Sequence, residues 1–379
     1  MSNQTFQILK ELPTPLYQTQ CVLHKHEILI CGGRFKRACY SYHTLKNEYK
    51  FICDYPSHVK LNGHCVVKLD NNNKNSNQIT LLSFGGSEHV KRHTLVMKYI
   101  SWVPFTDNHN NPIIILRDNI DFQGARAVIG GSNSHLLFIT YLYKNISVFD
   151  LNTLQFIKHD TLQFRDYCQI WYHCFVSKSE NIQGQEMMKT NQGKSKQNQM
   201  LLFKQNIGLS IEYDEDNNTF QFHQLPVCKD IEPFSHYAYV CVNDVILFFG
   251  GWNYINNATS KLVRKYSIQE NKWTTFQNIL HSRLYDCTAI LSEEDNIHII
   301  GGMDDKDRKL STHINTKVRV CDPSQLSKND IKCIIQYWNR TLEIRFGWID
   351  DFDKITVKSK IKIFVNNSIF KYGFDFDFS

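Results

Sequence analysis

The chain has 379 residues, of which 42% are hydrophobic and 21% are charged, and its formal net charge is +6. The apolar content is enough for a large core, and the modest charged fraction excludes a chain that is disordered throughout. The small basic excess slightly favours an acidic partner, but it excludes the dense Lys and Arg patterning of a dedicated nucleic-acid binder.

The first residues, MSNQTFQILKELP, lack the basic start and apolar stretch of a secretory signal. No segment approaches 18 consecutive apolar residues, so a membrane span is not expected. With 12 cysteines and no secretory signal, the sequence indicates free thiols in a reducing compartment. We therefore expect a cytoplasmic protein.

The first predicted element is a strand at residues 5–13. Behind it, an apolar run that ends in a glycine pair occurs twice, as ILICGG ending at Gly33 and LLSFGG ending at Gly86. The two pairs lie 53 residues apart and are surrounded by other short β-rich runs. This spacing predicts a repeat of about fifty residues, with Tyr42 and Tyr49 as aromatic residues of its last two strands.

The next two copies have lost the glycine pair but keep four β-rich runs each. Aromatic residues seven positions apart again mark their last two strands: Phe149 and Phe156, then Tyr213 and Phe220. Gly130 and Gly131 precede a strand rather than end one, so they are placed in the first turn of the third copy.

The fifth copy is the best formed, because ILFFGG ends at Gly251, Tyr266 follows, and Trp273 comes seven residues later. The sixth copy has IHIIGG ending at Gly302 but no aromatic fourth strand. The strand at residues 5–13 is expected to supply it, with Phe6 in the place of the tryptophan. Closing the ring in this way removes a bare sheet edge.

The order of strand, double glycine, spaced tyrosine and tryptophan resembles the kelch repeat over roughly residues 6–322. The resemblance implies an all-β fold, a six-bladed kelch-like β-propeller closed by an N-terminal strand, with a short helical or irregular C-terminal extension. We expect the propeller at residues 5–325 and the extension at 326–379. Asn/Gln-rich inserts near 70–78 and 179–198 are interpreted as surface loops, with binding segments as the alternative.

No catalytic residue, metal ligand or cofactor is expected, because the chain has no Walker loop, HExxH, GxSxG or CxxC pattern. First strands carry a small residue at about the same place, which favours packing near the axis over thiol chemistry: Cys21, Cys65, Ala127, Cys174, Ala238 and Cys287. His64, His173 and His236 are also assigned to first strands, and a metal site gathered from several blades is the alternative to a structural role.

The turns between second and third strands are expected on one face of the ring, opposite the inserts. They combine Arg with aromatic residues, as the centres of protein interfaces do. We predict a partner-binding site there made of Arg34, Phe35, Arg37, Arg92, Tyr143, Trp252, Tyr254 and Arg308. Ordinary solvated turns are the alternative.

The function predicted from these features is that of a monomeric protein-interaction scaffold or adaptor. It would bind a protein segment, acidic in the favoured case, and neither nucleic acid nor membrane. Many kelch-repeat proteins are adaptors, which is analogy at the level of the fold. The alternative is a kelch-like enzyme, an oxidase, lyase or epimerase, with its site in the central funnel.

Overall fold

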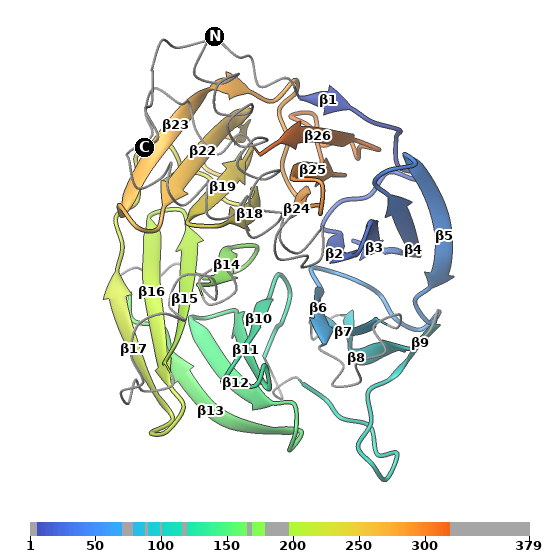
Figure 1. The fold of residues 1–379 in the computed structure, drawn as a ribbon, viewed down its shortest axis with the longest axis vertical. Coiled ribbons are helices and arrows are strands. Elements are labelled where there is room, and N and C mark those ends of the chain that lie inside the picture. The colour runs from blue at the N-terminus through green and yellow to red at the C-terminus, as the bar shows by residue number, and fades with distance from the viewer. Residues whose placement is uncertain are drawn as a thin grey trace, which may run out of the picture. The chain divides into compact units, whose positions relative to one another are not determined.

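The computed structural model of the chain describes residues 6–69, 79–87, 90–98, 101–115, 120–164, 169–178 and 197–318. Met1–Val318 forms one compact unit, and its described part contains six four-stranded antiparallel sheets arranged in a ring (Figure 1). The fold is a six-bladed β-propeller, as predicted. The predicted extension at 326–379, the insert at 70–78 and positions 179–196 of the second insert lie outside the described residues.

Each blade is a sheet whose four strands follow one another outward from the axis. The first three blades are β2 (Gln20–His24), β3 (Glu27–Gly33), β4 (Lys36–His43) and β5 (Glu48–Asp54); β6 (Cys65–Leu69), β7 (Thr80–Ser87), β8 (Val90–Lys98) and β9 (Ser101–Pro104); and β10 (Arg126–Gly130), β11 (Leu136–Tyr141), β12 (Asn145–Asp150) and β13 (Gln155–Thr161). The last three are β14 (Cys174–Ser177), β15 (Gln197–Lys204), β16 (Ile207–Asp214) and β17 (Thr219–Gln224); β18 (Ala238–Val242), β19 (Val245–Phe249), β22 (Leu262–Ser267) and β23 (Lys272–Ile279); and β24 (Thr288–Leu291), β25 (Asn296–Ile300), β26 (His313–Lys317) and β1 (Gln7–Ile8). A small hairpin, β20 (Trp252–Asn253) with β21 (Ala258–Thr259), extends the fifth blade.

The aromatic residues seven positions apart lie directly opposite one another on the two outer strands of their blades. A short turn makes this pairing, because it places the residues that precede it beside those that follow it. The rings of Tyr266 and Trp273 are 5.1 Å apart between centroids. The predicted pairs are all confirmed in register: Tyr42 with Tyr49, Phe149 with Phe156, Tyr213 with Phe220, and Tyr266 with Trp273.

In the fifth and sixth blades, the glycine pair lets the second strand approach the segment that leads into the next blade. Gly250 has a φ of +67°, and a Cβ placed on it would lie 2.1 Å from the carbonyl oxygen of Leu284. The neighbouring Gly251 donates its backbone N–H to that same oxygen at 2.8 Å. Glycine is therefore needed both for the left-handed backbone and for a direct backbone contact between blades.

The N-terminal strand closes the ring, as predicted. β1 pairs antiparallel with β26, with Gln7 opposite Asn315 and Ile8 opposite Ile314. Phe6 is buried in the apolar cluster shared by the fifth and sixth blades. The carbonyl oxygen of Phe6 also lies 2.8 Å from His281 Nε2, so the closing segment is held by its side chain and its backbone.

Replacing Phe6 with Ala is expected to lower the free energy of unfolding by about 3 kcal/mol, because a buried aromatic side chain is lost where the ring closes. Ile8, in the same short strand, is 69% exposed, and Ile8→Ala should change it by less than about 0.5 kcal/mol. Urea unfolding followed by tryptophan fluorescence measures both. Equal losses from the two variants would contradict the role given to Phe6.

Candidate functional site

A collar of six residues surrounds the axis. Each has a positive φ and lies two residues before the first strand of its blade: Gln18, Gly63, Gly124, Tyr172, His236 and Asp286. Backbone hydrogen bonds join them across blades. Gly124 N–H donates to Gly63 O at 2.7 Å, and Tyr172 N–H donates to Gly124 O at 2.9 Å. In the other half of the collar, Asp286 N–H donates to His236 O at 2.8 Å and Gln18 N–H donates to Asp286 O at 2.9 Å.

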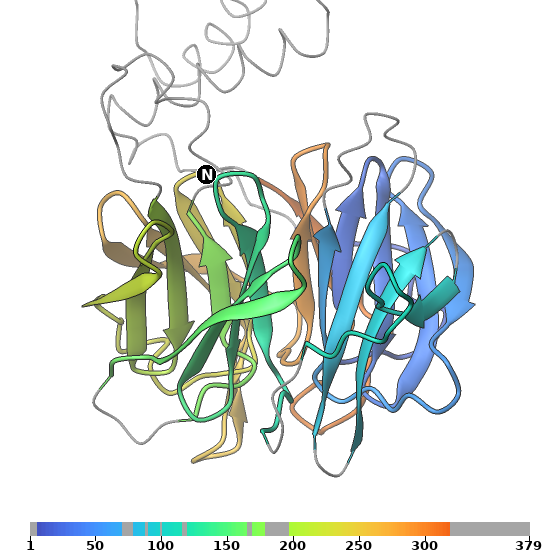
Figure 2. The same ribbon diagram turned by 90° about the horizontal axis from the view of Figure 1, so that it is seen from below.

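The collar lies at the end of the ring that carries the turns between second and third strands, which we call the 2–3 face. First and second strands are antiparallel, so a first strand begins at the end of the blade where the second strand finishes. Gln20 at the start of β2 pairs with Cys31 near the end of β3. The strands run between the two ends of the ring, so their turns fall on one end or the other (Figure 2).

Tyr172 fills the space above the two glycines of the collar. A Cβ added to Gly63 would lie 2.5 Å from the hydroxyl oxygen of Tyr172, and one added to Gly124 would lie 3.0 Å from its ring. The Tyr172 ring also stacks on His236, with 4.5 Å between centroids. The two glycines therefore make room for one large side chain from another blade.

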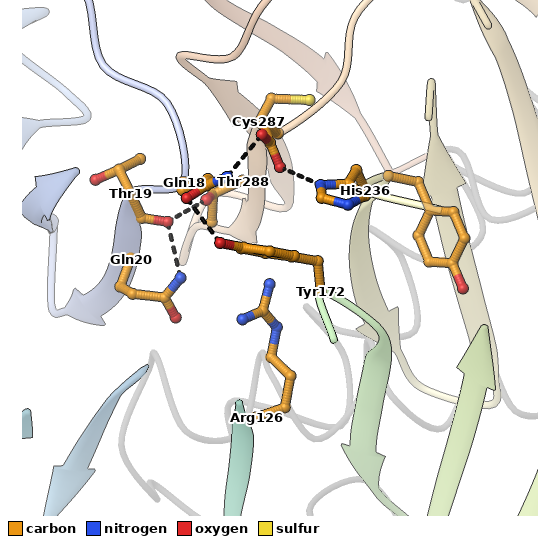
Figure 3. A pocket seen from close by; sticks show the side chains of 10 residues that line it. Gln18, Thr19, Gln20, Arg126, Tyr172, His236, Cys287 and Thr288 are labelled. Carbon is orange, nitrogen blue, oxygen red and sulfur yellow. Dashed lines mark hydrogen bonds and ion pairs between the residues drawn. The ribbon is translucent and has the colours of Figure 1, made fainter. Parts of the chain in front are cut away.

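Hydrogen bonds join the side chains of the collar into one network (Figure 3). Tyr172 donates its hydroxyl to Gln18 Oε1 at 2.9 Å, and Gln18 Nε2 donates to Asp286 Oδ2 at 2.9 Å. The other oxygen of Asp286 lies 2.7 Å from His236 Nδ1. Burial raises the pKa of Tyr172, so its phenol stays protonated and acts as a donor. Both carboxylate oxygens of Asp286 are engaged.

Arg126 brings a positive charge to the axis. Its Nη1 donates to the carbonyl oxygen of Ala125 at 3.0 Å, and its guanidinium lies 5.8 Å from the centroid of the Tyr172 ring. No carboxylate partner is recorded for it among the described residues. Burial lowers the pKa of His64 to about 4, and the charge of Arg126 contributes to this decrease. Arg126 and Asp286 thus place one positive and one negative charge near the axis.

The cavity between these residues is small. It is lined by Gln20, Arg126, Tyr172, His236 and Thr288 among others, and its volume is about 20 Å³. That is room for about one water molecule. The His236–Asp286 pair and Arg126 line this space and can bind water or a small polar group there.

Two of the predicted first-strand histidines connect neighbouring blades instead of meeting at a shared site. His64 Nε2 lies 2.9 Å from the carbonyl oxygen of Cys31, and His173 Nε2 lies 2.6 Å from the hydroxyl of Thr140. None of the three lies in a first strand, which corrects the sequence analysis: His64 and His173 lie one residue before β6 and β14, and His236, which belongs to the collar, lies two residues before β18. Within the described ranges, no group of three or more His, Cys, Asp or Glu side chains is arranged to hold a metal ion.

The first-strand cysteines are equivalent only in part, which corrects the sequence analysis. Cys65, Cys174 and Ala238 each lie two residues after the collar, and each pairs with the last residues of a second strand. Cys21 and Ala127 lie one residue later, and Cys287 lies one residue earlier. Because side chains alternate between the two faces of a strand, a shift of one residue reverses the face.

Three of the predicted partner-binding residues are exposed aromatics in turns of the 2–3 face. Phe35, Tyr143 and Tyr254 are 57%, 62% and 58% exposed. The guanidinium of Arg34 lies 5.3 Å from the centroid of the Phe35 ring. Trp252 reaches inward to the collar, where its ring lies edge-on to His236 with 5.8 Å between centroids.

The remaining predicted residues each have a different position or partner. Arg37 Nη1 donates to the carbonyl oxygen of Tyr55 at 3.0 Å. Arg37 and Arg92 lie in the third strands β4 and β8 and not in the turns, which corrects the sequence analysis. Arg308 forms an ion pair with Asp304 at 2.6 Å. The structure therefore brings together Arg34 with Phe35, and Trp252 with the collar. In the described part of the chain, no contact is recorded that joins Tyr143 to the other predicted residues.

The sequence analysis missed the collar. Its six positions share a backbone conformation and no residue type, so no pattern of residues marks them. The one usable signal was position, since each lies just ahead of a first strand. The distance from the collar position to the glycine pair varies between copies, and the fourth copy has no pair, so alignment on the glycines does not bring Tyr172, His236 and Asp286 into one column.

Comparison with models of protein families found no match, and comparison with characterised proteins found none either. Among solved structures, the chain is similar to the structure of YjhT, with a TM-score of 0.55 and 13% sequence identity over 82% of this chain and 97% of that one. A likeness at this identity shows the fold alone. The kelch-repeat assignment stays a prediction. Nothing in the described part of the chain forms the kind of extended apolar helix that a membrane span requires.

Proposed function

We propose that this propeller is a protein-binding scaffold that holds a segment of a partner protein across its 2–3 face. The observation that carries the proposal is the backbone of two exposed aromatic residues. Phe35 has a φ of +57° and Tyr143 a φ of +65°, which is the left-handed region. Bulky residues are uncommon there, whereas Gly and Asn adopt this conformation readily.

The side chains of Phe35 and Tyr143 contribute little to the stability of the free protein. A left-handed conformation costs a side chain with a Cβ about 1 kcal/mol relative to glycine. More than half of each side chain is exposed, so burial offsets little of that cost. Large, rigid aromatic side chains on a surface are the residues that dominate binding energy at protein interfaces. Contact with a partner accounts for both their type and their exposure.

An acidic partner segment is supported by the charges beside these aromatics. Arg34, Lys36, Arg37 and Lys144 lie in or next to the same turns, and Arg126 adds a positive charge at the axis. Such charges mainly speed the encounter and orient the partner. The cavity at the axis holds about one water molecule, so the enzyme alternative gains no support from its size.

The proposal is tested with a double variant, Phe35→Asn with Tyr143→Asn. Peptides are selected from a random library on the immobilised wild-type chain, and their affinities are measured by fluorescence anisotropy. We expect the selected peptides to be rich in Asp and Glu, and to bind the double variant at least about tenfold more weakly. The free energy of unfolding should stay the same or rise by about 1 kcal/mol.

Leu45→Asn is the matched control, because Leu45 is 62% exposed in the turn between β4 and β5 at the opposite end of the blade. It should leave peptide affinity unchanged. Peptides that bind the double variant as tightly as the wild-type chain would overturn the proposal. So would a selection that yields no peptide above an empty support.

A further inference from the structure

Three cysteines form a row across the first blade. Cys31 on β3 lies opposite Cys39 on β4, and Cys39 lies opposite Cys53 on β5. The three strands are neighbours in one sheet (Figure 1). All three are free thiols. We call Cys31, Cys39 and Cys53 the thiol row.

The side chains of the thiol row point to the same face of the sheet. Residues directly opposite in an antiparallel pair share a face, and their Cα atoms lie roughly 4.5–5.5 Å apart. A disulfide needs Cα atoms roughly 4.4–6.8 Å apart. Cys31 and Cys39 belong to one apolar cluster, and Cys53 packs against it. Each adjacent pair in the row therefore has the backbone spacing of a disulfide.

Solvent reaches the row from one end only. Cys31 and Cys39 are 1% and 0% exposed, whereas Cys53 is partly exposed on the outer strand. An oxidant therefore meets Cys53 first. The middle thiol, Cys39, contacts both of its neighbours, and it also accepts a hydrogen bond from Trp102 Nε1 at 3.4 Å.

We propose that the thiol row is an oxidation site, in which Cys53 and Cys39 become linked by a cross-strand disulfide. The oxidant is a low-molecular-weight disulfide such as oxidised glutathione. The Cys53 thiolate attacks one sulfur of the oxidant, whose S–S bond breaks, and one glutathione leaves and takes up the proton lost by Cys53. The Cys39 thiolate then attacks the sulfur of Cys53 and releases the second glutathione, which takes up the proton of Cys39. The two cysteines lose two electrons, and the oxidant is reduced to two thiols.

The environment sets the speed of this reaction. Contact with Cys39 and burial raise the pKa of Cys53, and contact with Cys31 raises that of Cys39. Because the thiolate is the reactive form, the row should react more slowly than an exposed thiol. The rate should rise about tenfold for each pH unit below the pKa of the attacking thiol.

The bridge would fix β4 against β5 just behind the turn that carries Arg34 and Phe35. Cys39 Sγ donates to the carbonyl oxygen of Arg37 at 3.7 Å, and the N–H of Tyr55 donates to the same oxygen at 2.9 Å. A disulfide would remove the first of these bonds. Any effect on partner binding rests on the proposed function, whereas formation of the disulfide does not.

The test uses the full chain in a mixture of oxidised and reduced glutathione at pH 8, followed by alkylation, trypsin digestion and mass spectrometry. Trypsin places the three cysteines on separate peptides, 26–34, 38–46 and 51–60. We expect a linked pair of peptides 38–46 and 51–60, and its formation should be about tenfold slower at pH 7. Cys31→Ala should leave this product in place, and Cys39→Ala should leave Cys53 as a mixed disulfide with glutathione.

Cys21 is the matched control in the same blade. It is partly exposed, and burial raises its pKa, but the apolar cluster around it contains no other cysteine. Cys21 should give at most a mixed disulfide. Two outcomes would overturn the proposal in the wild-type chain itself, so they do not depend on the folding of any variant. One is Cys53 that remains a mixed disulfide, and the other is a bridge between Cys31 and Cys39.

Discussion

Replacing Gly250 with Ala is expected to lower the free energy of unfolding by about 4 kcal/mol. The new Cβ would lie 2.1 Å from the carbonyl oxygen of Leu284, at a φ of +67°. Backbone atoms on both sides fix this contact, so neither can yield without separating the fifth blade from the sixth. The hydrogen bond from Gly251 N–H to the Leu284 oxygen, 2.8 Å long, would be lost as well.

The same loss is expected at the next junction, where a Cβ on Gly301 would lie 2.4 Å from the carbonyl oxygen of Leu16. Asn110→Ala separates the cost of the left-handed backbone from the cost of the contact between blades, because Asn110 has a φ of +63° in an exposed turn. It should lose no more than about 1 kcal/mol, the cost of the backbone conformation alone. Urea unfolding measures all three variants. If Gly250→Ala lost no more stability than Asn110→Ala, the contact between blades would not be the reason for the glycine pair.

The parts of the fold that were predictable from sequence depend on residues close together in the chain. Tyr266 and Trp273 face each other because one short turn separates them, and that spacing is visible in the sequence. The closing strand was predictable for a related reason, since the sixth copy lacked an aromatic fourth strand and Phe6 remained without a blade. These inferences needed only the period of the repeat.

The site was less predictable because it depends on backbone conformation and on contacts between blades. Gln18, Tyr172 and Asp286 share a positive φ but no chemical type, so no residue pattern marks the collar. The register of Cys21 and Cys287 differed by one residue from the prediction, because small apolar residues do not fix a strand to the exact position. The register is fixed by the residues with which the strand pairs. The turns of the 2–3 face were found from the glycine pairs, but the contact of Trp252 with His236 required the fold.

Lowering the pH from 7 to 4.5 is expected to remove several kcal/mol of stability. Burial lowers the pKa of His64 to about 4 and that of His298 to about 4, and it lowers the pKa of His93 and His313 to about 3. In the unfolded chain each imidazole binds a proton near pH 6.5. In the folded chain each stays neutral over most of the range between 6.5 and 4.

The sign follows from proton binding. Between pH 6.5 and 4 the unfolded chain binds more protons than the folded chain, so the free energy of unfolding falls as the pH falls through this window. Above 6.5 both states are neutral at these positions, and stability no longer depends on them. For His64 alone, the difference between 6.5 and about 4 corresponds to about 3 kcal/mol. Urea midpoints at pH 7.0, 5.5 and 4.5 measure the total.

Carboxylates act in a different window, which makes the origin of the effect measurable. Hydrogen bonds from Asn111 lower the pKa of Asp107 below its ordinary 3.8, so stability from this group is lost only below that pH. His64→Gln keeps a donor for the carbonyl oxygen of Cys31 and should flatten the slope between pH 6.5 and 4.5. Leu45→Asn, which removes no titratable group at an exposed position, should leave the slope unchanged.

The two histidines beside the closing strand should respond as a pair. His298 Nδ1 lies 2.9 Å from His313 Nε2, and His313 Nδ1 lies 2.5 Å from the hydroxyl of Tyr49 on the first blade. One added proton only fixes the direction of these hydrogen bonds, whereas protonation of both rings places two N–H groups against each other and breaks the contact within the sixth blade that leads to the first. Acid should open this junction only near pH 3 to 4, where both rings take up protons, and hydrogen exchange in that range should be fastest in β1 and β26. Uniform exchange across the six blades would show that the pair is not the weak point.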